Sequence, residues 1–135
     1  MTTNELYDLA QVDNIPIYSY DLKGIESLSL PLKNKCFIAI DPMLIKSYSD
    51  EKVKLAHELG HCETGSFYNE YTSLDIRGKH ERRADCWAIK KLIPKEELEK
   101  AYKNCRNRYE LSEYFGVTED FMQKALEYYF EQIFQ

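Results

Sequence analysis

Two histidines four residues apart, His57 and His61, constrain this chain more than any other feature of its sequence. On a helix, residues at this spacing lie on the same face, so both imidazoles can reach one metal ion. Glu58 follows the first histidine, where its carboxylate can reach a water on that metal. Zinc accepts imidazole ligands and can hold and acidify a water at an open coordination position. The segment therefore predicts a helix with two zinc ligands and a general base, and a third ligand has to come from elsewhere.

The competing interpretation is that this short motif occurs by chance on a surface helix. The chain has only three histidines, however, and two of them fall in the motif. Gly60, between them, indicates either a close approach of another backbone or simple packing. Apolar flanking residues favour a largely buried helix, in which unliganded histidines would need other polar partners; they are Val53, Leu55, Ala56 and Leu59. These observations favour a metal site.

A second predicted helix, residues 78–92, offers Glu81 and, four residues later on the same face, Asp85. A carboxylate oxygen of Glu81 can complete a set of three ligands and leave a position for water. Asp85 can accept the outer N–H of a ligand histidine and fix its tautomer. The alternative is that both carboxylates pair with neighbouring cations on a solvated face. Apolar residues on this helix require part of that face to point inward, which favours the ligand role; they are Ala84, Trp87, Ala88 and Ile89.

Four further residues are weaker candidates for the site. Glu63 lies two residues after His61 and therefore on a different face. His80 can be a third ligand or donate to a transition-state oxyanion, although a structural histidine is the favoured interpretation. Tyr68 and Tyr71 lie in the loop that follows the motif and can also stabilise an oxyanion. For each tyrosine, packing against the core or within a lid is the favoured alternative.

The rest of the sequence predicts an α+β fold in one domain, residues 1–135. Apolar periodicity and turn residues indicate a small, mostly antiparallel sheet with four or five helices. Strands are expected at residues 15–20, 27–30 and 36–40, and helices at residues 4–12, 50–63, 78–92 and 95–105.

The C-terminal segment, about residues 109–134, predicts a helical hairpin packed on this domain. Residues 111–126 have the pattern of a helix-turn-helix, which raises the alternative of a DNA-binding regulator. Between residues 109 and 135, however, one basic residue stands against six acidic ones, a net charge of −5. Such a charge opposes the phosphate contacts that supply most DNA affinity, so no direct binding of nucleic acid is expected.

Composition indicates a cytoplasmic protein without a membrane segment. No basic and apolar leader is visible, and no apolar stretch approaches the length of a bilayer span. The four cysteines (Cys36, Cys62, Cys86 and Cys105) form no CxxC pair and are expected to be reduced. Cys62 and Cys86, next to candidate site residues, are expected to be core residues.

Three segments resemble the ImmA/IrrE metallopeptidase family, especially its short forms from prophages and mobile elements of Gram-positive bacteria. They are HELGHCETGSFY at residues 57–68, ERRADCWA at residues 81–88 and LIP at residues 92–94. The arrangement of the later glutamate and aspartate is also similar to that of thermolysin-like zinc peptidases. The resemblance implies a compact α+β, zincin-like domain.

The resemblance also implies a function. By position, His57, His61 and Glu81 would hold one zinc ion and Glu58 would be the general base of a cytoplasmic endopeptidase. Some members of the family cleave a helix-turn-helix repressor, so such a repressor is the expected protein partner. The alternative is a non-catalytic metal-containing protein that binds a repressor or another partner without cleaving it.

Overall fold

The computed structural model describes residues 1–133, and its elements follow one another in an α-β-β-β-α order completed by four more helices. They are α1 (Thr3–Val12), β1 (Ile17–Ser19), β2 (Ser27–Leu32), β3 (Lys35–Ile40), α2 (Tyr48–Thr64), α3 (Leu74–Leu92), α4 (Lys95–Tyr102), α5 (Arg108–Phe115) and α6 (Glu119–Ile133). The expected α+β class is confirmed. Within the described residues there are six helices, where four or five were expected.

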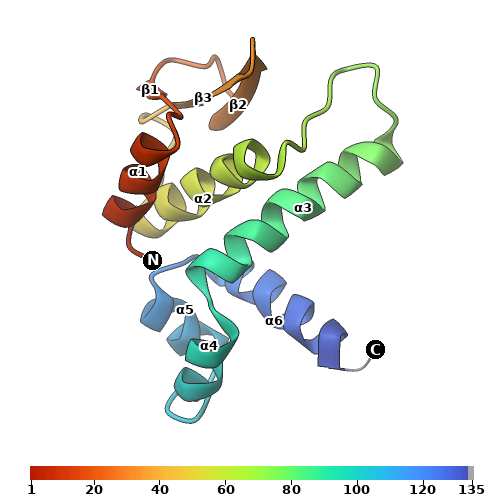
Figure 1. Ribbon diagram of the computed structural model, residues 1–135. Helices are drawn as coiled ribbons and strands as arrows, with labels where there is room; N and C mark the ends of the chain where they lie inside the picture. Colours follow the sequence, from red (N-terminus) through yellow and green to blue (C-terminus); the bar gives the residue numbers. More distant parts are fainter. Residues whose placement is uncertain (134–135) are drawn as a thin grey trace.

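Helix α2 lies between the sheet and α3 (Figure 1), and the two helices run side by side in opposite directions. Gly60 explains how closely they approach: a Cβ at this position would lie 2.5 Å from the backbone oxygen of Ala84. The first of the two explanations for this glycine, close approach of another backbone, is therefore the right one. Any larger residue would push α3 away from α2.

The sheet is mixed, with its longer pairing antiparallel as expected and a shorter parallel one in addition. Its strand order is β1-β3-β2, with β1 parallel to β3 and β2 antiparallel to it. A two-residue turn, Lys33 and Asn34, joins β2 to β3, and both residues have the positive φ that such hairpin turns require. The loop between β1 and β2 crosses the position of β3, so β1 and β2 pair with opposite edges of β3.

Strand β2 continues through Pro31 to Leu32, two residues beyond the expected end. A proline cannot donate to a neighbouring strand, but β2 is an edge strand and has only one neighbour in the sheet. The other edge of β2 is therefore open.

The core spans α2, the sheet and the C-terminal helices, which lie together below α2 in Figure 1. Fully buried side chains come from every part of it, among them Leu6, Ile38, Leu55, Leu59, Leu92, Ile93 and Met122. The Tyr129 hydroxyl of α6 donates to the backbone oxygen of Ile93 at 2.6 Å, and Lys52 of α2 donates to that of Phe115 at 2.6 Å. These bonds fasten the α5–α6 hairpin to the end of α3 and to α2.

The cysteine expectation is wrong for Cys36 and Cys62, which form a disulfide between β3 and α2. Their Cα atoms are 5.7 Å apart, within the usual range for a bridge. Cys62 is partly buried and packs against the core, as expected, while its sulfur bonds to Cys36 of the sheet. Sequence spacing alone did not indicate this pairing. Cys86 and Cys105 are free.

In the described part of the chain, no helix combines the length and apolar character needed to cross a membrane.

Candidate metal centre

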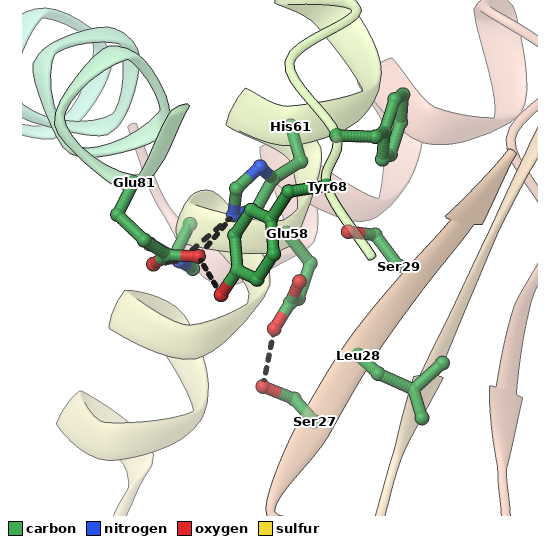
Figure 2. A pocket seen from close by; sticks show the side chains of 9 residues that line it. Ser27, Leu28, Ser29, Glu58, His61, Tyr68 and Glu81 are labelled. Carbon is green, nitrogen blue, oxygen red and sulfur yellow. Dashed lines mark hydrogen bonds and ion pairs between the residues drawn. The ribbon is translucent and has the colours of Figure 1, made fainter. Parts of the chain in front are cut away.

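The structure brings His57, His61 and Glu81 together, with one potential ligand atom from each within 4.8 Å of the others. The two Nε2 atoms lie 3.2 Å apart on adjacent turns of α2. Glu81, on α3, places its Oε2 2.8 Å from His57 Nε2 and its Oε1 3.1 Å from His61 Nε2. Figure 2 shows the Glu81 carboxylate reaching across to the His61 ring. These residues form a group able to hold a metal ion.

The outer nitrogens of both histidines bind partners away from Glu81, so the Nε2 atoms are the ligand positions. His57 Nδ1 lies 2.8 Å from Asp85 Oδ1, as expected for a residue one turn after Glu81. His61 Nδ1 bonds to the backbone oxygen of Ser66, which follows the end of α2 at Gly65. Because carboxylate and carbonyl oxygens only accept, each Nδ1 carries a proton. Each Nε2 faces the Glu81 carboxylate and is the nitrogen that would bind a metal after losing its own proton.

The local charges favour a cation at this point. Burial disfavours the charged form of His57, but its hydrogen bonds to Asp85 and Glu81 outweigh that effect and raise the pKa of His57 to about 10. Burial also opposes the charge of His61, yet Glu81 and the Ser66 carbonyl raise its pKa. Hydrogen bonds from His57 and His61 hold the pKa of Glu81 well below its usual range. The site therefore stabilises positive charge between two imidazoles and a carboxylate.

The donor set fits a zinc ion. Zinc–nitrogen distances of about 2.0 Å give a tetrahedron with edges of about 3.3 Å. The two Nε2 atoms are 3.2 Å apart, close to that edge. Each of them also lies near one of the two Glu81 oxygens, at 2.8 Å for Oε2 and 3.1 Å for Oε1. Three protein ligands of this kind leave the fourth corner open, as in catalytic rather than structural zinc sites.

Glu58 lies on the side of α2 that faces the sheet, and only 6% of its surface is exposed. Its Oε2 accepts a hydrogen bond from the Ser27 hydroxyl at 2.7 Å (Figure 2). Ser27 is the first residue of β2, so the carboxylate sits between the metal group and the edge of the sheet. A general base for a water at the open corner would occupy this place.

A cleft of about 340 Å³ joins these groups. One wall is the start of β2, another is the motif helix, and the third is formed by the loop after α2 together with Glu81. Its lining residues are Ser27, Leu28, Ser29, His57, Glu58, His61, Phe67, Tyr68 and Glu81. The open edge of β2 thus runs along the cleft beside the metal group.

Of the four weaker candidates, one lines the cleft and three do not. The Tyr68 hydroxyl donates to Glu81 Oε1 at 2.8 Å and lines the cleft. Tyr71 is 89% exposed and does not line it. His80 also lies outside the lining, with its ring stacked against that of Tyr68 at 6.3 Å between centroids. Glu63 interacts with Asp13, at the end of α1, rather than with the metal group.

Three contributors were missed from the sequence. Ser27 donates to Glu58, and the strand pattern SLSLPL placed its serines on one face without indicating which face. The backbone oxygen of Ser66 accepts a hydrogen bond from His61 Nδ1. Such a main-chain contact does not depend on residue type, so the sequence does not indicate it. Lys124 of α6 lies 3.4 Å from Asp85 Oδ2, a contact that depends on where the hairpin packs.

Fold and site together define a class: a small α+β domain with a His, His, Glu metal group beside a buried glutamate, as in metal-dependent hydrolases. The family model of the IrrE N-terminal-like domain, a peptidase family, matches residues 14–127. The chain belongs to this family, and the resemblance to ImmA/IrrE metallopeptidases is confirmed. Among curated proteins, no match was found.

Proposed function

We propose that this protein is a zinc-dependent endopeptidase with His57, His61 and Glu81 as ligands and Glu58 as general base. The observation that carries the proposal is the convergence of two Nε2 atoms and a carboxylate at one point, with Glu58 adjoining it on the cleft wall. A zinc ion bound there would polarise the scissile carbonyl and lower the pKa of a water to about 7. Family membership supports the same reaction class.

The residues of the chain have separate tasks in this mechanism. Asp85 and the Ser66 carbonyl orient the two imidazoles. Glu58 takes a proton from the attacking water and passes it to the leaving amine. Tyr68 lines the cleft, and its hydroxyl, which donates to Glu81 Oε1 here, would donate to the developing oxyanion in the reaction.

The open edge of β2 supports a peptide substrate in extended form. Main-chain groups of an edge strand can pair with an added strand, and this edge runs along the cleft. The family resemblance supports a helix-turn-helix repressor as the protein that supplies this strand. Such a substrate is encountered in the cytoplasm, where we place the activity.

Replacing Glu58 by Gln tests the proposal, because the amide keeps the size of the side chain but cannot accept the water's proton. We expect cleavage to fall by about 10²- to 10⁴-fold while the zinc content stays at one ion per chain. Repressor cleavage and bound zinc are measured on the same preparations. Glu63→Gln, the same change on an exposed residue of the same helix, is the matched control.

Unchanged cleavage by Glu58→Gln would contradict its role as base. If the unmodified protein binds zinc and a repressor tightly without cutting it, the non-catalytic alternative takes the place of this proposal.

A further inference from the structure

Glu58 belongs to a stripe of α2 that is fastened to the sheet, distinct from the stripe that carries the histidines. Lys54, Glu58 and Cys62 recur every four residues and therefore share one helix face. Each makes one attachment outside the helix: an ion pair at 3.0 Å, a hydrogen bond at 2.7 Å and a disulfide. Their partners, in the same order, are Glu26, Ser27 and Cys36. The carboxylate of Glu58 thus lies at the middle attachment.

The hydrogen bond from Ser27 selects one orientation of the carboxylate. Within residues 1–133, the Ser27 hydroxyl is the side-chain group that donates to Glu58, and it reaches Oε2. With Oε2 occupied, Oε1 is the oxygen left to accept from a molecule in the cleft that Glu58 lines. Without this donor, rotation about the last side-chain torsion, which is broad for Glu, would turn the plane of the carboxylate and move both oxygens away from this orientation.

The backbone around Ser27 is itself fixed, so its hydroxyl is a stable reference point. Ser27 lies opposite Ile40 of β3 in the antiparallel register. Next to it, the backbone N–H of Asp41 donates to the backbone oxygen of Glu26 at 2.9 Å. The start of β2 is thereby held on both sides of the contact with α2.

We propose that Ser27 is a positioning residue that holds the Glu58 carboxylate in the orientation needed for proton transfer. The inference rests on the proposed function, because Glu58 is the base only in that reaction. In this role, the Ser27 hydroxyl binds Glu58 rather than a metal ligand or the substrate. Its removal should lower kcat while leaving KM and zinc affinity unchanged, whereas a mere tie between strand and helix would change stability alone.

Ser27→Ala and Ser27→Thr separate these possibilities, since threonine restores a hydroxyl and suits a strand. We expect kcat of Ser27→Ala to fall about 10- to 100-fold, the range for a lost hydrogen bond to a charged group. KM and the dissociation constant for zinc should stay within about 2-fold, and Ser27→Thr should recover most of kcat. Ser19→Ala is the matched control, because Ser19 pairs with the same residue, Ile40, from the other side of β3 and lies outside the cleft.

Crystal structures of the zinc-loaded variants supply a readout that does not depend on turnover. We expect one carboxylate orientation in the unmodified protein and in Ser27→Thr, and more than one in Ser27→Ala. A single unchanged orientation in Ser27→Ala would overturn the proposal, and so would an unchanged kcat in an active enzyme. A protein that cuts no substrate would instead sink the proposed function, and the crystallographic comparison would still decide whether Ser27 positions Glu58.

Discussion

The two faces of helix α2 hold their functional side chains by different physical means. His57 and His61 face α3, where their partners are the ionised carboxylates of Glu81 and Asp85. Glu58 faces the sheet, where a neutral hydroxyl holds it between an ion pair one turn earlier and a disulfide one turn later. On the α3 side, charged groups surround a position that a cation can occupy. On the sheet side, the contacts hold the edge strand β2 against the helix.

This difference separates metal binding from the geometry of the reaction. Changes on the α3 side should alter zinc affinity and its dependence on pH. Changes on the sheet side should alter stability or kcat and leave the metal in place. Glu58 lies close to both faces, but its orientation depends on the contact with Ser27 on the sheet side.

The largest expected effect comes from removing the disulfide with Cys36→Ser and Cys62→Ser together. A bridge between residues 26 apart in sequence stabilises by restricting the unfolded chain, by about 3–4 kcal/mol for this loop length. We expect the free energy of unfolding, measured with denaturant in non-reducing buffer, to fall by that amount. The zinc dissociation constant should change little, because the bridge lies on the sheet side.

The corresponding control is Cys86→Ser with Cys105→Ser, which alters the two free cysteines. A reducing agent should reproduce the loss in the unmodified protein and have no further effect on the variant without Cys36 and Cys62. Equal stability of all forms would show that the bridge does not fasten α2 to the sheet. A loss of zinc affinity in the variant without Cys36 and Cys62 would contradict the claim that the sheet side does not affect metal binding.

On the other face, Asp85→Asn removes the charge that holds His57 Nδ1. Replacing such an outer partner typically lowers metal affinity about 10- to 100-fold. We expect a shift of this size in competition titrations with a chelator. The zinc-free protein should also lose stability at neutral pH, because Asp85 stabilises the protonated form of His57 there. Asp75→Asn, in the first turn of the same helix, should leave the affinity unchanged. An unaltered affinity in Asp85→Asn would mean that Asp85 does not orient the ligand.

The smallest effect is that of a change of one pH unit on zinc affinity. Because the pKa of His57 is raised to about 10, His57 carries a proton at neutral pH that a metal must displace. The apparent zinc affinity should therefore rise about tenfold per pH unit from about pH 7 toward about pH 10, and fall toward acid. Calorimetry in buffers of different ionisation enthalpy should detect about one proton released per ion at about pH 8. No proton release would contradict the charge state described for this face.

The sequence predicted the α3 side of the site better than the sheet side. Periodicity within single helices placed His57 with His61 and Glu81 with Asp85, because helical spacing is fixed by local geometry. The pairing of β1 with β3, the Ser27 contact and the Cys36–Cys62 bridge depend on how distant segments pack. The parallel pairing of β1 and the bridge between Cys36 and Cys62 were not predicted for this reason. Helix α3 also begins earlier than expected, at Leu74, in a stretch without clear apolar period.

The central claim, that His57, His61 and Glu81 hold one catalytic metal, is tested most directly by anomalous diffraction at the zinc edge from crystals of the zinc-loaded protein. The account predicts a single peak with His57 Nε2, His61 Nε2 and a Glu81 oxygen at about 2.0–2.2 Å and an open fourth position beside Glu58. A peak elsewhere, a Glu81 side chain turned to solvent, or a fourth protein ligand would contradict it.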